Sequence, residues 1–314
     1  MGRKNMSKNY SSTRGAGFEA DLSLRDAVRR RLHFIDFRLT WEGQINRGDL
    51  VETFGISIPQ ASSDLALYQD LGDGNVSYDK SLKAYIAAEQ FEPVFGSPDA
   101  QDYLSRLRAI SYGLSSPSAA WVGRMPMVET VPYPKRAVAP GTLRHVLRAI
   151  SDKRAIRVRY QSFSRPEPSF RWIAPHALGY DGHRWHARAY CYDREGFVDF
   201  ALGRVLAVRG DRPTDVEARD DRSWNTEIIL LVGVNPELSP GQQKALELDY
   251  EMKKGRREIP VRAALVHYMR RWLRLDLDAR QARPQQRQIV LLNAEEVEQQ
   301  MAELRGDDGP GNEA

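Results

Sequence analysis

INRGDLVETFGISIPQASSDLALY, residues 45–68, contains two helix starts separated by a glycine turn. Asn46 and Ser57 belong to the residue types that cap helix N-termini, and Pro59 falls in the first turn after Ser57, where its missing N–H is harmless. Gly55 stands where the first helix must end and the chain must turn. The pattern predicts two helices locked across this turn by a small apolar core made of Leu50, Val51, Phe54, Ile56, Ala61 and Leu65.

The flanking sequence extends this pair of helices into a larger unit. Upstream, apolar residues recur at helical spacing from Leu24 to Leu39, and Gly43 is placed to end that helix. Downstream, residues 75–79 and 83–87 have the composition of two short strands around a turn that contains lysine. Helix, short helix, glycine turn, helix and hairpin is the element order of a winged helix-turn-helix, with an unrelated helical hairpin as the alternative.

Composition restricts the class of protein. The 314-residue chain is 41% apolar and 28% charged, which is typical of a globular protein with more than one core. It has no run of about 18 apolar residues and no apolar segment near its amino terminus, so we expect a cytoplasmic protein that does not cross a membrane. The single cysteine, Cys191, excludes an intramolecular disulfide and a thiolate metal cluster, and we expect it to be buried.

Charge is unevenly distributed along the chain. The formal net charge is +4, but residues 1–40 carry +5, residues 41–140 carry −4, residues 141–212 carry +7 and residues 213–314 carry −4. Two basic segments separated by acidic ones indicate two places where a polyanion could bind. Solvated arginine-rich faces are the alternative explanation.

The chain divides by composition and pattern into segments that together predict an α+β protein with several domains. We assign a disordered basic tail (1–17), the winged helix-turn-helix (18–95), a linker helix with a Pro-rich extended connector (96–140), a small β-barrel (141–212), a small α/β module (213–304) and a polar tail (305–314).

The two later domains are predicted from short apolar runs. Alternation in residues 156–160 and 185–190 places arginines and aromatic residues on opposite strand faces, and we expect Trp172 and Trp185 in the core. The barrel, of the Sm-like or SH3-like type, would combine a helix over 143–150 with strands over 155–160, 170–173, 177–180, 184–192, 198–201 and 205–208. The last module would combine strands over 227–234, 258–261 and 288–292 with helices over 239–250 and 263–273.

This order of parts resembles the WYL-domain transcriptional regulators of the BrxR/CapW type, which accompany bacterial anti-phage defence operons. The likeness covers about residues 22–292, and it departs from the family at the name-giving tripeptide, which here is Trp185-His186-Ala187. The stretches that carry it are GQINRGDLVETFGISIPQASSDLALY and YDKSLKAY in the first part, RYQSFS, RWIAPHALGYDGHRWHARAY and FALGRV in the second, and LSPGQQKALELDYEM and RAALVHYMRRWL in the third.

The winged helix implies a DNA-binding surface. The third helix of such a domain lies in the major groove, and here it offers Gln60, whose amide can bond an adenine edge at two points, together with Ser57, Ser62 and Ser63. This helix has no lysine or arginine, so phosphate contacts must come from elsewhere. The candidates are Arg29, Arg30, Arg47, Lys80 and Lys83, with idle surface charge as the alternative for each.

The resemblance also implies a ligand pocket on one face of the barrel. Its polar lining would supply guanidinium groups for phosphate, an aromatic ring for base stacking and further hydrogen-bonding groups, which suits single-stranded nucleic acid or a nucleotide. In the alternative, Arg171 and Arg204 form structural salt bridges with Asp199 or Asp181. By position the lining residues are Tyr160, Ser162, Arg171, His176, His186, Arg188 and Arg204.

Two classes of function follow from these features, and neither is enzymatic, since the chain has no phosphate-binding loop, nucleophile elbow or metal-ligand set. The first is a homodimeric repressor that binds an inverted-repeat operator, autoregulates a defence operon and responds to the ligand. The second is a nucleic-acid sensor or accessory protein that does not recognise an operator. A cofactor is expected in neither class. Arg270 and Arg274 form an i,i+4 pair on or near the predicted helix 263–273, and we expect them to approach nucleic acid or to close the barrel pocket of a partner subunit.

Overall fold

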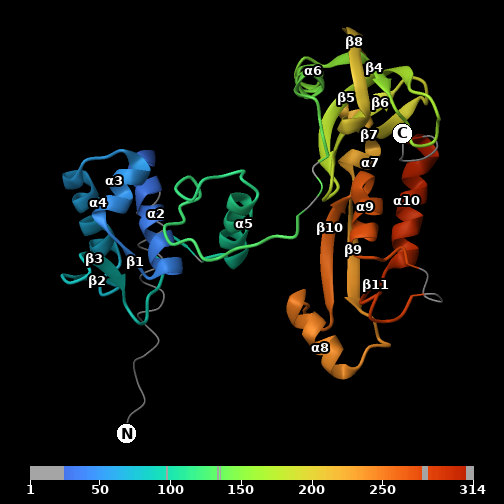
Figure 1. Cartoon of the computed structure of the whole chain (residues 1–314). Coiled ribbons are helices and arrows are strands. Elements are labelled where there is room, and N and C mark those ends of the chain that lie inside the picture. Colours follow the sequence, from blue (N-terminus) through green and yellow to red (C-terminus); the bar gives the residue numbers. More distant parts are fainter. Residues whose placement is uncertain (1–24, 97, 133, 135, 278–281, 309–314) are drawn as a thin grey trace. The chain divides into compact units, whose positions relative to one another are not determined.

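The computed structural model describes residues 25–308, apart from 97, 133, 135 and 278–281. The predicted basic tail and the last residues of the predicted C-terminal tail lie outside the described residues. The chain forms two compact units, one up to residue 133 and one from residue 134 (Figure 1). The boundary between the units falls inside the Pro-rich connector.

The first unit contains the predicted winged helix-turn-helix. Gly43 and Gly55 end their helices with the positive φ angles of 69° and 64° that favour glycine. Asn46 caps its helix with a reciprocal capping box, in which its side chain and that of Asp49 each accept a backbone N–H. The elements are α2 (Asp26–Glu42), β1 (Gln44–Ile45), α3 (Arg47–Phe54), α4 (Ile58–Leu71), β2 (Val76–Asp79) and β3 (Ala84–Ala87).

The wing is a three-stranded antiparallel sheet instead of a simple hairpin. Its order is β1-β3-β2, with Gln44 opposite Ile86 and Ile45 opposite Tyr85. The sequence does not predict the strand β1, because two residues are too short for a pattern and its partner lies about forty positions along the chain. The domain core contains Leu32, Phe34, Ile35, Leu39, Ile45, Leu50, Ala61, Leu65 and Tyr68.

The segment that follows the wing packs back on the first unit. The helix α5 (Ala100–Ser111) is the predicted linker helix, and Tyr103 on it stacks on Trp41 of α2 with ring centres 4.9 Å apart. Farther along, both oxygens of the Glu42 carboxylate accept backbone N–H groups, from Gly123 at 2.7 Å and Arg124 at 3.1 Å. The expectation that the whole of 96–140 connects two domains therefore needs correction, because its first part belongs to the winged-helix unit.

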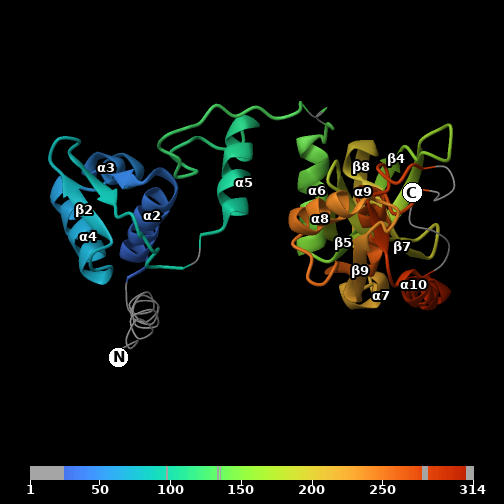
Figure 2. The same cartoon turned by 90° about the horizontal axis from the view of Figure 1, so that it is seen from below.

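The second unit begins with the barrel. Its five antiparallel strands have the order β7-β6-β5-β4-β8. The helix α6 lies beside this sheet (Figure 2). It packs on the core through Val146 and Ala149. The hydroxyl of Tyr160 on β4 accepts the backbone N–H of Ala201 on β7, which links two strands that are not neighbours in the sheet. The elements are α6 (Pro140–Ser151), β4 (Arg154–Tyr160), β5 (Ser169–Tyr180), β6 (Trp185–Cys191), β7 (Gly196–Ala201), η1 (Leu202–Arg204) and β8 (Val205–Pro213).

Three details of the barrel differ from the sequence-based prediction. The two strands predicted at 170–173 and 177–180 are one strand, β5, whose register shifts between Pro175 and Ala177. Trp185 is 49% exposed because it is the first residue of β6, beyond the end of the core. Trp172 is half-buried and lies under the Arg212 guanidinium. Neither tryptophan is a core residue, whereas Cys191 is buried as expected.

The C-terminal module joins a sheet of order β10-β9-β11 to helices that cover it. The helix α10 is absent from the sequence-based prediction, although Val297, Met301 and Leu304 recur at helical spacing and pack into this core. No described helix is both long enough and apolar enough to cross a membrane. The elements are η2 (Ala218–Asp220), α7 (Arg222–Asn225), β9 (Glu227–Val234), α8 (Pro240–Asp249), β10 (Arg256–Arg262), η3 (Ala263–Leu265), α9 (Val266–Trp272), β11 (Ile289–Leu291) and α10 (Ala294–Asp308).

Candidate DNA-binding and ligand-binding sites

The N-terminal turns of α4 carry a polar surface. Ser57 caps the helix by accepting the backbone N–H of Gln60 at 3.3 Å, so its oxygen is partly engaged. Ser62 and Ser63 donate their hydroxyl hydrogens to the carbonyls one turn earlier, at 3.0 and 3.1 Å. Their oxygens remain acceptors, so in this arrangement the two serines suit donor groups on a base edge and not phosphate oxygens.

Gln60 is the residue on α4 with the strongest recognition chemistry. Its side chain is exposed, and its Nε2 donates to Asp64 Oδ1 at 3.1 Å. Asp64 in turn binds Arg31 of α2 at two points, with Oδ2 2.6 Å from Nε and Oδ1 3.1 Å from Nη2. One amide hydrogen and the amide oxygen of Gln60 stay available for an adenine edge. The buried pair between α2 and α4 therefore orients the Gln60 side chain.

The predicted phosphate-binding residues have different surroundings. Lys80 and Lys83 are exposed at the turn of the wing, where Asp79 accepts two backbone N–H groups and fixes the turn. Arg30 is exposed on α2, whereas Arg29 pairs with Asp26 at 2.6 Å. Arg47 is half-buried between the rings of two wing tyrosines, 5.4 and 5.8 Å away. The wing lysines and Arg30 are thus the most accessible cations of this set.

Four of the predicted ligand residues gather where β4 ends, and we call Tyr160, Ser162, Arg171 and Arg204 the β4-end cluster. The guanidinium of Arg171 lies 5.7 Å from the centre of the Tyr160 ring. The Arg204 carbonyl accepts the N–H of Gln161, which ties η1 to the loop after β4. Tyr160 is only 1% exposed, so the expectation that it stacks on a base needs correction: the ring is a core residue that helps to close the barrel.

Arg171 is the unusual member of this cluster. It is 3% exposed, and its Nε lies 3.5 Å from the Ser169 hydroxyl, at the outer limit of a hydrogen bond. Its terminal Nη2 is buried and makes no hydrogen bond within the described part of the chain. Burial lowers the pKa of this guanidinium. A buried cation with an unmade hydrogen bond is costly, and an anion that enters here would remove the cost.

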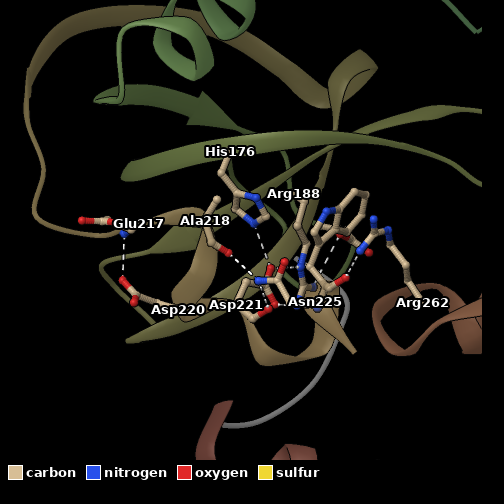
Figure 3. Close-up of polar contacts among 10 residues, drawn as sticks. His176, Arg188, Glu217, Ala218, Asp220, Asp221, Asn225 and Arg262 are labelled. Atoms are coloured by element: carbon tan, nitrogen blue, oxygen red, sulfur yellow. Dashed lines mark hydrogen bonds and ion pairs between the residues drawn. The ribbon is translucent and has the colours of Figure 1, made fainter. Parts of the chain in front are cut away.

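The other predicted ligand residues, His176, His186 and Arg188, are held by carboxylates. Arg188 binds Asp221 at two points, 2.7 Å from Nε to Oδ2 and 3.0 Å from Nη2 to Oδ1, and its Nη1 lies 3.6 Å from Asp199. His176 Nε2 is 2.8 Å from the same Asp221 (Figure 3). Burial raises the pKa of Asp221, but His176 and Arg188 lower it more, and the net shift is downward. These groups are engaged by carboxylates inside the protein.

A second chain of contacts joins the barrel to α9. His186 Nε2 lies 3.0 Å from Asp181 Oδ2, and the Tyr268 hydroxyl donates to Asp199 Oδ2 at 3.1 Å. Burial raises the pKa of Asp199 despite the neighbouring Arg188. We call the connected set Asp181, His186, Arg188, Asp199, Asp221, His176 and Tyr268 the barrel-base network.

The barrel does contain structural salt bridges, the alternative to a ligand pocket, but they involve other arginines than expected. Arg188 and Arg184, not Arg171 and Arg204, pair with the aspartates that the sequence offered, Asp199 and Asp181. The sheet face that carries Arg188 is opposite the core face, and residues of α7 and α9 contact it. Tyr190 lies on the same face as Arg188, so the expected separation of arginines from aromatic residues over 185–190 needs correction. The predicted pocket is therefore divided, and the β4-end cluster is the part whose guanidinium groups are not engaged by carboxylates in the described chain.

Comparison with known proteins follows the same division of the chain. Models of the BrxR transcriptional regulator winged helix-turn-helix domain, the WYL domain and the BrxR C-terminal dimerization domain match residues 27–109, 141–209 and 227–297. The DNA-binding transcriptional repressor CapW of Stenotrophomonas maltophilia is 42% identical over 285 residues, which are 90% of this chain and 95% of that protein. The chain belongs to the CapW family.

Other CapW proteins are nearly as similar. The repressor CapW of Pseudomonas aeruginosa is 38% identical over 268 residues, 85% of this chain and 90% of that protein. Among solved structures, proteasome accessory factor B/C of Arthrobacter aurescens is 16% identical and matches 98% of this chain and 55% of its own, with a TM-score of 0.25, too low to support a conclusion. The family expected from the sequence is confirmed.

Three residues of this CapW-family chain belong to the sites although the sequence did not single them out. Asp221 is the N-cap of α7 and the centre of the barrel-base network, and its position before Ser223 and Trp224 gave only a weak helix-start signal. Tyr268 reaches the barrel from the next domain, which no local pattern indicates. Phe163 is 84% exposed under the Arg204 guanidinium, 5.3 Å away, and an aromatic residue within the polar RYQSFS stretch was a usable sequence signal.

Proposed function

We propose that this chain is a homodimeric transcriptional repressor that binds an inverted-repeat operator. It represses a phage-defence operon that includes its own gene. It releases DNA when a nucleic-acid or nucleotide ligand binds the barrel. CapW relatives are named as DNA-binding repressors, and the third family model describes a dimerization domain. The observation that carries the proposal is the exposed, oriented Gln60 on α4 of a winged helix.

The DNA-binding part of the proposal rests on a division of roles. The amide of Gln60 supplies discrimination between base pairs, while the wing lysines and Arg30 supply affinity that does not depend on sequence. A homodimer places two such helices on one duplex, which requires an operator with two related half-sites.

The ligand part rests on the β4-end cluster. Among the described residues, the Nη2 of the buried Arg171 has no hydrogen-bond partner, and the exposed ring of Phe163 lies beside the guanidinium of Arg204. A phosphate can bind two guanidinium groups, and a base can stack on an exposed ring, so this set suits a nucleotide or a single strand. The ligand shifts DNA affinity only if it binds the DNA-free form more tightly, which makes the coupling measurable.

A reporter assay tests the repressor function. The DNA upstream of the gene is fused to a reporter, and the chain is expressed in trans. We expect repression that is lost when one arm of the inverted repeat is scrambled and when Gln60→Ala is introduced. Equal reporter output with and without the chain would contradict the repressor function and would favour the accessory protein, which needs no operator.

Ligand control is tested by release of operator DNA. A short single-stranded oligonucleotide is titrated into the protein bound to labelled operator, with Arg171→Met as the test variant and Arg159→Met, an exposed arginine on β4, as the matched control. We expect the oligonucleotide to release DNA from the wild type and the control but not from Arg171→Met. Tight oligonucleotide binding that leaves operator affinity unaltered would show that the ligand does not control DNA binding.

A further inference from the structure

A cationic cavity lies at the joint between the barrel and α9. Its volume is about 470 Å³, within the range of sites for small organic ligands, roughly 300–1,000 Å³. Three parts of the second unit build it: the extended segment before α6, the turn between β5 and β6, and α9 with the residue after its C-cap. The lining residues are Arg136, Asp181, His183, Arg184, Tyr268, Arg271, Trp272 and Arg274.

This cavity is distinct from the β4-end cluster. Arg171 is near the start of β5, whereas Asp181 follows the last residue of that strand. Ten residues of strand at about 3.3 Å each separate the two sites by roughly 30 Å along β5. A small ligand cannot occupy both sites at once, and no residue of the proposed barrel pocket lines this cavity.

The charge of the lining favours an anion. The lining contains four arginines and one carboxylate, that of Asp181. This carboxylate already accepts a hydrogen bond from Arg184 Nε at 3.1 Å and lies 3.0 Å from His186 Nε2. Within the described chain, no carboxylate lies in ion-pairing distance of the Arg136 or Arg274 guanidinium. The guanidinium groups around the cavity repel each other, and a bound phosphate would attract all of them and offset this repulsion.

An aromatic surface accompanies these charges. Trp272, the last residue of α9, is 67% exposed, whereas most other large apolar side chains of the C-terminal module pack inside. An exposed indole beside guanidinium groups is the combination that binds a base on its face and a phosphate at its edge.

The backbone around the cavity is fixed. Asp181 accepts the N–H groups of His183 and Arg184 at 2.8 and 2.7 Å, which holds the β5–β6 turn. After α9 the chain turns through Arg274, which has a φ of 56° and donates its N–H to the Arg271 carbonyl at 3.1 Å. The arginine side chains therefore project from positions that are set before a ligand arrives.

We propose that this cavity is a second binding site, for a nucleotide unit whose phosphate binds Arg271, Arg274 and Arg136 and whose base stacks on Trp272. The chemistry is shared by a free mononucleotide and by one residue of a single strand. The site does not depend on the proposed repressor function, because it uses neither α4 nor the β4-end cluster.

Binding of two probes to the full-length protein tests the site. The first is a fluorescein-labelled hexathymidylate with a 5′-phosphate, followed by polarisation, and the second is adenosine monophosphate as an unlabelled competitor. We expect Trp272→Ala to weaken binding of the labelled probe by about fivefold or more, as for loss of one stacked base, and Trp272→Phe to restore most of it. Arg274→Met should weaken binding and reduce its salt dependence.

Matched variants separate this site from other basic surfaces. Arg256→Met removes an exposed cation from the basic turn at residues 253–257, and Arg171→Met alters the β4-end cluster. In both variants, the contribution of Trp272 to hexathymidylate binding should remain, so that adding Trp272→Ala still weakens binding. Competition by adenosine monophosphate would identify a free nucleotide as the ligand, and competition only by unlabelled hexathymidylate would identify a strand.

Three results would overturn the proposal. The first is no binding of either probe, and the second is binding that Trp272→Ala and Arg274→Met leave unchanged. The third is a change of sedimentation coefficient in these two variants that accounts for the weakened binding, because the cavity wall would then be a subunit contact and not a ligand site.

Discussion

Arg188 on β6 and Asp221 at the N-cap of α7 form a two-point ion pair that is almost completely buried, with side chains 1% and 0% exposed. The pair joins the barrel to the first helix of the C-terminal module, and His176 binds the same carboxylate. Because the geometry satisfies both oxygens, the cost of desolvating the two charges is offset. The barrel and the module are therefore expected to unfold as one cooperative unit.

Removing one member of this pair should destabilise the second unit strongly. Asp221→Asn leaves the buried Arg188 without its counter-charge, and we expect the free energy of unfolding to fall by about 3–5 kcal/mol. Urea denaturation followed by circular dichroism measures the change. The control is Glu217→Gln in the exposed pair with Arg219, for which we expect less than about 1 kcal/mol. Equal effects of the two substitutions would contradict the structural role of the Arg188–Asp221 pair.

Gln60→Ala should lower specificity and leave non-specific DNA binding nearly unchanged. The lost amide is worth about 1–3 kcal/mol of discrimination, so affinity for the operator should fall by roughly 5- to 150-fold. Gln299→Ala on α10 is the control, because it removes an exposed glutamine amide outside the winged-helix unit. Fluorescence polarisation with operator and scrambled duplexes checks this. A loss of affinity that is the same for both duplexes would show that Gln60 does not recognise bases.

The wing lysines should act through DNA phosphates. Lys80→Ala and Lys83→Ala are expected to weaken binding to every duplex by a similar factor, and each should reduce the slope of log affinity against log salt by about 1. Lys244→Ala removes an exposed lysine of the C-terminal module that is paired with Glu247, and it should leave the slope unchanged. Titrations at four salt concentrations give the slopes, and unaltered slopes in the wing variants would place the wing away from DNA.

Asp181 should make stability depend on acidity. Burial raises its pKa, but bonds from His186 and from the Arg184 and His183 backbone lower it more, to about 2. A folded-state pKa below the ordinary 3.8 means that the stabilisation is complete above about pH 4 and is lost as the pH falls towards 2. The destabilisation caused by Asp181→Asn should thus be larger at pH 5 than at pH 2.5. Urea unfolding at both values measures it, and a pH-independent difference would contradict this assignment.

Local signals predicted the fold of the first unit well. Asn46, Ser57, Gly43 and Gly55 mark helix ends through contacts with residues no more than four positions away, so a single sequence contains the whole interaction. The strand β1 depends on pairing with a distant strand, and a pattern of two residues cannot indicate it. Helix α10 did carry a periodic apolar signal, which the prediction missed.

The sites were harder to predict because their character depends on burial and distant partners. Tyr160 and Arg188 have the chemistry of ligand-binding residues, yet one closes the barrel and the other binds Asp221, 33 positions away. Arg171 has the same residue type as Arg188, but in the described part of the chain its Nη2 makes no hydrogen bond, whereas Arg188 binds Asp221, and the sequence does not reveal this difference. Residue identity indicated a candidate region of the barrel, and the structure distinguished side chains that carboxylates engage from those without such a contact in the described chain.

The most direct test of the repressor function is the affinity of the purified protein for its own upstream DNA and for a scrambled duplex, measured by fluorescence polarisation at two salt concentrations. We predict that the upstream duplex binds at least about 10³-fold more tightly at both concentrations, because base recognition persists when phosphate contacts are screened. Equal affinity for the two duplexes, with the same steep salt dependence, would contradict operator recognition.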